Sequence, residues 1–141
     1  MQHEHTRSLS KDSFNVGGTL RHVAPEVHSE RVSRPNTQSD VYSMGMTILE
    51  LATLNPPFFK YQKAVRAAIA AEDGERPERP ARLADLFFPE EEFLWGLMQG
   101  MWADNPQLRP TVRHVQDDLV HLSSLCVTWK RVRVPQTPFR P

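Results

Sequence analysis

The sequence has a single cysteine, Cys126, and no long apolar run. One cysteine excludes an intrachain disulfide framework and is typical of a protein from a reducing compartment. No stretch approaches the roughly 18 consecutive apolar residues of a membrane span, and residues 1–15 are too polar for a signal peptide. We therefore expect a soluble protein of the cytoplasm or another intracellular compartment.

The chain also has no excess of charge of either sign. Its 17 basic and 17 acidic residues cancel, which argues against a general electrostatic attraction to nucleic acid or to membranes. Only the end departs from this balance, because residues 126–141 contain four basic residues and no acid. A helical adaptor that contacts nucleic acid or acidic lipid through this end is one hypothesis, although so few basic residues are a small footprint for such a partner.

No segment shows a convincing alternation typical of a strand, and 12 prolines divide the chain into pieces of helical length. We expect a mainly α domain. Its main predicted helices cover Ser39–Leu54, Tyr61–Ala71, Glu90–Met101 and a stretch after Thr111. The predicted apolar faces are Val65, Ala68 and Ile69 in the second helix, Phe93, Leu94, Leu97, Met98 and Met101 in the third, and Val112, Val115, Leu119 and Leu122 in the last.

The segment Ser39–Leu54 organises the chain, since it has only two charged residues and should be mostly buried. Thr37 or Ser39 can cap its start, and Pro56 and Pro57 follow its end. Asp40 in its first turn has two interpretations. It is either an acid favoured by the helix dipole, or a carboxylate that enters the core and positions another backbone segment through hydrogen bonds.

Both ends of the chain differ in composition from its middle. We expect a polar segment over residues 1–16, one domain over 17–122, and a basic, proline-containing tail over 123–141. The polar segment has hydroxyl groups next to Arg7 and Lys11 that are possible phosphorylation sites, namely Thr6, Ser8, Ser10 and Ser13. The spacing of its histidines does not suit a metal site, so no metal is expected.

Three motifs in this order resemble the C-terminal lobe of eukaryotic protein kinases. Residues 18–26, GTLRHVAPE, resemble the G-T-x-x-Y-x-A-P-E end of the activation segment, and residues 39–45, SDVYSMG, resemble the opening of the lobe's central helix. Residues 102–111, WADNPQLRPT, are similar to the W-x-x-x-P-x-x-R-P-T ending. The amino-acid sequence of this central helix resembles that of the tyrosine-kinase-like group of Ser/Thr kinases. The resemblance covers residues 17–122 and implies a partial kinase lobe, from the end of the activation segment to the last helices.

The resemblance implies roles for single residues. Glu26 and Arg109 would form a buried ion pair that ties the activation segment to the lobe, and Asp40 would anchor the catalytic loop. The substrate loop would consist of Gly18, Thr19, Leu20, Arg21 and His22, where His22 replaces the usual tyrosine. Met101 stands at a position where kinases frequently have a cysteine. The helix over 61–71 resembles the family's docking helix, although a helix that only packs on the lobe is an equally good interpretation.

The motifs that perform phosphoryl transfer are not found in this sequence. It contains no G-x-G-x-x-G, V-A-I-K, H-R-D-x-x-x-x-N or D-F-G, so the N-lobe and the catalytic loop are expected to be absent. We expect part of an ATP-dependent serine/threonine kinase domain that is catalytically incompetent alone, with ATP and magnesium belonging to the complete domain and no cofactor in this chain. The alternative is a non-catalytic interaction module that binds kinases or protein substrates. Without a catalytic loop, Asp40 would be a buried carboxylate without partners, so the isolated chain is expected to fold poorly.

Overall fold

The computed structural model describes residues 19–31, 34–87 and 89–130. Within these ranges the chain is helical and contains no strand, which confirms the expectation of a mainly α fold. The elements are η2 (Thr19–Arg21), α1 (Pro25–His28), α2 (Thr37–Thr53), α3 (Ala64–Glu72), α4 (Arg82–Phe87), α5 (Glu91–Met101), η3 (Pro106–Leu108) and α6 (Val112–Lys130). None of these helices is long and apolar enough to span a bilayer.

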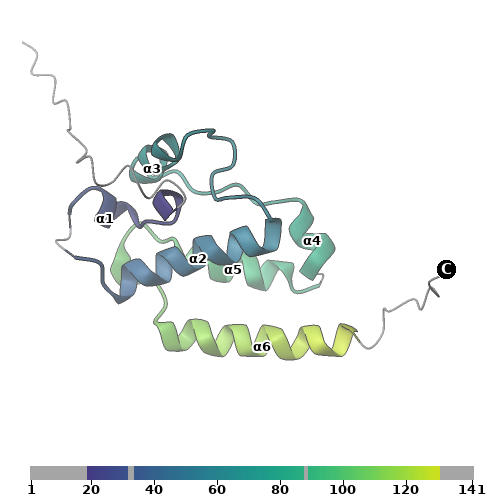
Figure 1. Ribbon diagram of the computed structural model, residues 1–141. Coiled ribbons are helices and arrows are strands. Elements are labelled where there is room, and N and C mark those ends of the chain that lie inside the picture. Colours follow the sequence, from purple (N-terminus) through teal and green to yellow (C-terminus); the bar gives the residue numbers. More distant parts are fainter. Residues whose placement is uncertain (1–18, 32–33, 88, 131–141) are drawn as a thin grey trace, which may run out of the picture.

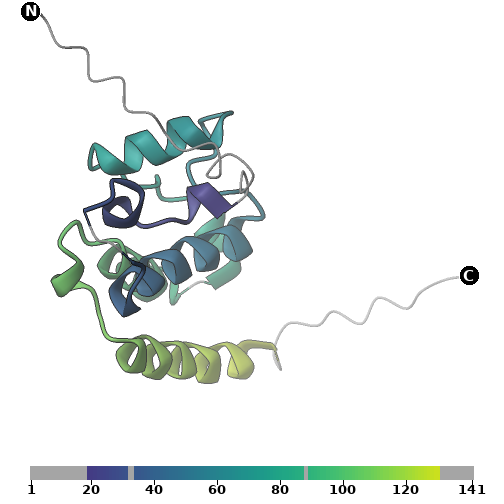
Figure 2. The same ribbon diagram turned by 60° about the vertical axis from the view of Figure 1, so that its left-hand side comes forward.

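Helix α2 lies in the centre and packs against α5 (Figure 1). The small elements η2 and α1 contact α3 on one side of this pair, while α6 runs along the other side, as Figures 1 and 2 show. Side chains of α2 and α5 form most of the core, which includes Tyr42, Met46, Met98 and Met101, each without exposed surface. Residues from distant parts of the sequence are thereby held around one central helix.

The start of α2 is capped by Asn36, which was not the predicted cap. Its side-chain oxygen accepts hydrogen bonds from the backbone N–H groups of Gln38 and Ser39, at 3.0 and 3.1 Å. The hydroxyl of Ser39 in turn accepts the N–H of Asn36 at 2.9 Å, so the two residues form a capping box. The prediction that Thr37 or Ser39 caps the helix was therefore wrong, because Asn36 is the last residue with extended backbone.

One side of α2 is covered much less than the sequence predicted. Asp40 and Thr47 are exposed, and Leu51 keeps 71% of its surface, whereas Val41 and Tyr42 are buried. Asp40, Thr47 and Leu51 are seven and four residues apart, so they lie on one face of the helix. No other described element covers this face. The expectation that Asp40 is buried is wrong for this structure, and the penalty expected for an unpaired buried carboxylate does not apply.

Helix α3 is shorter than predicted and is rotated relative to its predicted face. It begins at Ala64, and its buried residues are Ala67, Ala68, Ala70 and Ala71. Ile69, which was predicted to face the core, is 41% exposed. Four small side chains allow the helix backbone to approach η2 and α1 closely, so alanines rather than the larger apolar residues form the contact.

The C-terminal helices follow the prediction with local differences. The hydroxyl of Thr111 accepts the N–H of His114 at 3.2 Å, as expected for the cap of the last helix. This helix continues to Lys130, eight residues into the segment that was expected to be a tail. In α5, Trp95 is buried although it was not predicted, while Phe93 is 39% exposed and meets His121 edge to face. The short helix α4 was not predicted, since six residues are too few to show a period.

Candidate functional site

The guanidinium of Arg109 is the centre of the candidate site. Its Nη1 and Nη2 donate to the two carboxylate oxygens of Glu26, at 2.6 and 2.9 Å, and its side chain has no exposed surface. Nη1 also donates to the backbone oxygen of Gln38 at 3.0 Å, and Nε donates to that of Ala103 at 3.0 Å. A planar guanidinium suits this arrangement because it offers several donors in a fixed geometry.

Glu26 is placed for this contact by a short helix. Pro25 occupies the first turn of α1, where its missing N–H costs nothing, and Glu26 follows it and is 6% exposed. Burial by itself would raise the pKa of Glu26, but the hydrogen bonds and the charge of Arg109 outweigh it and hold that pKa below its ordinary value. Glu26 is therefore a charged carboxylate at neutral pH.

Tyr42 of α2 lies next to the same arginine. The guanidinium carbon of Arg109 is 5.0 Å from the centroid of the Tyr42 ring, and that of Arg76 is 5.7 Å away. Both distances suit cation–π contacts. Burial raises the pKa of Tyr42 to about 12, so the phenol is neutral at physiological pH. The ring links the Glu26–Arg109 pair to the centre of the lobe.

Arg76 was not singled out in the sequence, yet it joins three parts of the lobe. Its guanidinium donates to the backbone oxygens of Trp102, at 2.7 Å, and of Ala71, at 3.1 Å, and it forms an ion pair with Asp104. The only signal in the sequence is an arginine between Gly74 and Pro77 in a connector that has no period. Such a position does not reveal which distant carbonyl groups it binds.

The predicted substrate loop is fixed by Arg21. Its Nη1 donates to the carbonyl oxygens of Pro57 and Phe58, both at 3.0 Å, and its Nη2 donates to those of Tyr61, at 2.6 Å, and Gln62, at 3.2 Å. Leu20 beside it is partly buried. Gly18 and the side chain of Thr19 lie outside the described residues, as do Thr6, Ser8, Ser10 and Ser13.

Two histidines add further links between this segment and the lobe. Nε2 of His22 lies 2.7 Å from a carboxylate oxygen of Glu50 in α2, and Nδ1 of His28 contacts Glu72 in α3. The sequence predicted neither pair. His22 follows η2 and His28 ends α1, and nothing in the local pattern indicates their partners 28 and 44 residues away.

Asp40 stands apart from this junction. Its carboxylate is exposed in the first turn of α2 and has no hydrogen-bond or ion-pair partner among residues 19–31, 34–87 and 89–130. The same described ranges contain no group of three or more His, Cys, Asp or Glu residues that could hold a metal ion. The contacts of Arg109 join Glu26 of α1 to the backbone at Gln38 and Ala103, and the exposed carboxylate of Asp40 remains available as an acceptor.

Comparisons with known proteins agree with this arrangement. The chain is 30% identical over 121 residues to receptor-interacting serine/threonine-protein kinase 4 of Mus musculus, a match that covers 81% of this chain and 14% of that protein. It is 25% identical over 107 residues to receptor-interacting serine/threonine-protein kinase 2 of Bos taurus, with 75% and 20% covered. It is 34% identical over 99 residues to serine/threonine/tyrosine-protein kinase HT1 of Arabidopsis thaliana, with 70% and 23% covered.

The chain spans less than a quarter of the length of each of these relatives. The sequence model of the protein kinase domain matches residues 3–120, which is most of the chain. The helical fold, the converging motifs and these matches together show that the chain belongs to the protein kinase domain family and represents part of the domain's helical lobe.

Proposed function

We propose that this chain forms the substrate-loop and structural half of the helical lobe of an ATP-dependent serine/threonine protein kinase, and that its 141 residues alone transfer no phosphate. The observation that carries the proposal is the junction at Arg109. One guanidinium contacts Glu26 of the first kinase motif, the carbonyl of Gln38 directly before the second, and the ring of Tyr42 within the second. Arg109 itself belongs to the third motif.

In this proposal the junction holds the substrate loop in place. Glu26 follows the loop by a few residues and is fixed to the lobe by Arg109, while Arg21 within the loop is fixed by four carbonyl groups. Side chains held at these two points restrict a loop that would otherwise sample many conformations. Such a loop can receive a peptide in one orientation next to the phosphoacceptor, so we propose protein substrates as its partners.

The catalytic steps would be performed by residues that are not among these 141. Phosphoryl transfer requires groups that bind ATP, magnesium and the attacking hydroxyl, and the four motifs that supply them are absent from this sequence. The exposed face of α2 offers a surface on which the catalytic residues of a complete domain can pack. Asp40 offers a free carboxylate, and Leu51 on the same face exposes 71% of its surface, so a further segment of a kinase domain can pack there.

An assay of phosphate transfer tests the proposal. The purified chain is incubated with radiolabelled ATP, magnesium and a general protein substrate, next to a complete serine/threonine kinase as a positive control. We expect no incorporation above that of a sample without enzyme. Incorporation that scales with the concentration of the chain, and that is lost in the variant Arg109→Met, would overturn the proposal because a contaminating kinase does not respond to this substitution.

The exposed side of α3 supports a second candidate, a non-catalytic module that binds other kinases or substrates. Ile69 is 41% exposed and stands near Arg66, which is also exposed. Arginine is enriched at protein interfaces, and an exposed apolar side chain next to it adds apolar contact area. Under this candidate, Ile69→Glu abolishes capture of a kinase partner while Ile48→Val, on the opposite part of the lobe, does not; equal capture by both variants excludes it.

A further inference from the structure

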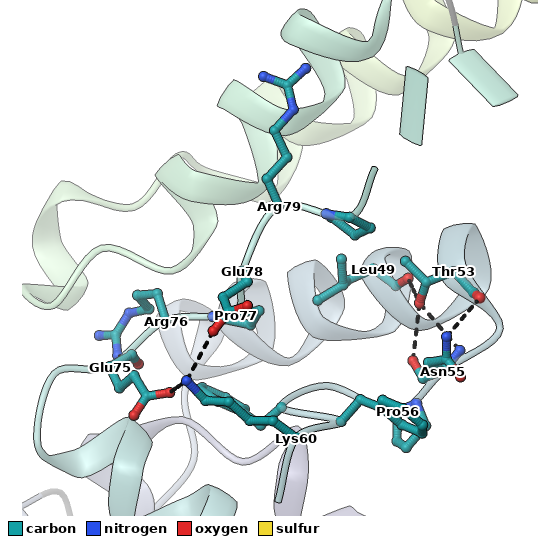
Figure 3. Close-up of a pocket in the computed structure, with 13 residues that line it drawn as sticks. Leu49, Thr53, Asn55, Pro56, Lys60, Glu75, Arg76, Pro77, Glu78 and Arg79 are labelled. Carbon is teal, nitrogen blue, oxygen red and sulfur yellow. Dashed lines mark hydrogen bonds and ion pairs between the residues drawn. The ribbon is translucent and has the colours of Figure 1, made fainter. Parts of the chain in front are cut away.

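A pocket of about 280 Å³ lies between the end of α2, the turn 56–60 and the connector 75–80 (Figure 3). Its apolar walls are formed by Leu49, Pro56, Phe58, Phe59, Pro77 and Pro80. Leu49 and Phe58 are 4% and 5% exposed, whereas Phe59 is 67% exposed and offers a ring at the edge of the pocket. A cavity of roughly 150 Å³ with apolar walls can hold benzene, so this volume suits one or two fused rings.

Hydrogen bonds to the backbone hold two walls of this pocket in place. In the connector, Nε of Arg76 donates to the carbonyl oxygen of Trp102 at 2.7 Å. In the turn, the carbonyl oxygens of Pro57 and Phe58 each accept a hydrogen bond from Arg21 at 3.0 Å. The prolines of both segments also have a fixed φ. A pocket whose walls are already ordered loses little conformational entropy when a ligand enters.

The charged side chains around the pocket already have partners. Three basic and two acidic side chains line it, and each forms an ion pair. The pairs are Lys60 with Glu75 and Glu78, as Figure 3 shows, Arg76 with Asp104, and Arg79 with Glu92. A charged ligand would lose water on entering and would have to compete with these pairs for a partner. The pocket therefore favours an uncharged ligand.

Asn55 adds a hydrogen-bond acceptor to the apolar walls. Its Nδ2 donates to the carbonyl oxygen of Thr53 at 3.3 Å, while its Oδ1 accepts no hydrogen bond within the described part of the chain. An N–H group on a ligand ring can donate to this oxygen. We propose that the pocket binds a small uncharged aromatic molecule of one or two rings with an N–H donor, packed against Leu49, Phe58 and Phe59.

Binding here acts on the loop that contains Arg21. Phe58 has a left-handed backbone, with φ of 54°, which costs free energy in a residue with a side chain. A ligand ring that packs on the Phe58 side chain favours this backbone, so the carbonyl groups of Pro57 and Phe58 stay oriented towards Arg21. Occupancy of the pocket thereby orders residues 20–22. Neither the binding nor the ordering requires ATP or a protein substrate, so both are independent of the role proposed for this loop.

Three indole compounds test the choice of ligand. Indole-3-ethanol, tryptamine and indole-3-acetate share a ring system and a two-carbon substituent, but they are neutral, positive and negative at pH 7. Each is titrated into the full chain, and binding is followed by amide chemical shifts. We expect saturable shifts in residues 58–60 and 75–79 with indole-3-ethanol, and binding at least about threefold weaker for both charged compounds. Equal affinity for all three, or shifts that never saturate, would overturn the proposal.

Two variants test the place of binding. Phe59→Ala removes an exposed ring from the wall and should weaken the binding of indole-3-ethanol by at least about threefold. Leu108→Ala is the matched control, because Leu108 is 73% exposed but does not line the pocket, and it should leave the affinity unchanged. Both substitutions remove exposed side chains and should leave the fold intact. An affinity that Phe59→Ala does not change would overturn binding in this pocket.

Hydrogen exchange tests the effect on the loop. Saturating indole-3-ethanol should slow amide exchange in residues 20–22 by at least about twofold in the unmodified chain. It should have no such effect in Arg21→Ala, which retains the apolar walls and should still bind the compound. Exchange that stays unchanged in the unmodified chain would overturn the coupling between pocket and loop. Equal slowing in both chains would also overturn it, because the effect would not pass through Arg21.

Discussion

A methyl group added at Gly45 would lie 2.5 Å from Nε1 of Trp102 and 3.0 Å from Cβ of Met101. Gly45 is in the middle of α2, and Trp102 directly follows α5 and is 2% exposed. The absence of a side chain at Gly45 thus allows the indole to lie against the central helix. We expect Gly45→Ala to lower the free energy of unfolding by about 1–3 kcal/mol, as overpacking of a core does.

Gly96 provides the matched control for this substitution. It is also helical, in α5, but a methyl group there would meet no atom within 4 Å. Gly96→Ala should therefore raise the stability by about 0.5–1 kcal/mol through its higher helix propensity. Urea unfolding of both variants measures the difference. Two variants that are stabilised alike would show that Trp102 does not pack on Gly45.

Leu54 has a left-handed backbone at the end of α2, with φ of 57°. Its side chain is 74% exposed, so it contributes little burial to offset the cost of this conformation. We expect Leu54→Gly to stabilise the chain by about 1 kcal/mol, since glycine adopts positive φ without a steric penalty.

Leu51 is the control for this prediction, because it is similarly exposed at 71% but lies within the helix and is not among the described residues with positive φ. Leu51→Gly should destabilise the chain by about 1 kcal/mol. Thermal melts of the two variants compare them directly. A loss of stability in both variants would contradict the assignment of strain to Leu54.

The carboxyl of Glu26 should give the protein part of its acid sensitivity. Its pKa is lowered in the folded chain because Arg109 outweighs the effect of burial, so the unfolded chain binds the proton at higher pH. The stability that this carboxylate contributes is present above its ordinary pKa of about 4.3 and is lost as the pH falls towards the lower folded value.

The variant Glu26→Gln isolates this contribution because it cannot titrate. The unmodified chain should be clearly more stable than Glu26→Gln at pH 6, and the difference should shrink between about pH 5 and pH 3. Urea midpoints across this range measure it. A difference that stays constant down to pH 3 would be incompatible with the lowered pKa.

Arg21 should control the order of the loop without being part of the core. In Arg21→Ala, four carbonyl groups lose their donor, and exchange of the amides in residues 20–22 should accelerate about tenfold. Arg31→Ala is the control, as Arg31 is exposed beyond α1. If both substitutions left the exchange of residues 20–22 unchanged, the carbonyl contacts of Arg21 would not hold the loop.

Much of the fold could be predicted because local chemistry determines it. The positions of the prolines, the hydroxyl of Thr111 and the apolar residues of α5 indicate where helices start and which side they bury. The helix faces that were predicted incorrectly depend on contacts with neighbouring elements. In α3, Ile69 has the more apolar side chain, but the close approach of η2 and α1 selects the small alanines instead.

The residues of the candidate site also differ in whether the sequence could predict their contacts. Glu26 and Arg109 could be named together only through the resemblance to kinases, since 83 residues separate them and no local pattern links them. The contacts of Arg21, Arg76, His22 and His28 depend on which carbonyl or carboxylate groups the fold brings near. The burial of Asp40 depends on an element that packs over α2, so the prediction from the sequence that its carboxylate is buried was wrong, while its role as an anchor stays a prediction.

Arg109 and Glu26 hold three kinase motifs together in this chain, and a double-mutant cycle measures the coupling between the two side chains. Glu26→Gln and Arg109→Met should each cost about 3–5 kcal/mol, because each leaves a buried charge without its partner. The double variant should lose clearly less than the sum, with a coupling of about 2–3 kcal/mol. The exposed pair of Arg79 and Glu92 is the control and should couple by less than about 1 kcal/mol. Equal, small couplings for both pairs would show that the buried pair does not hold the motifs together.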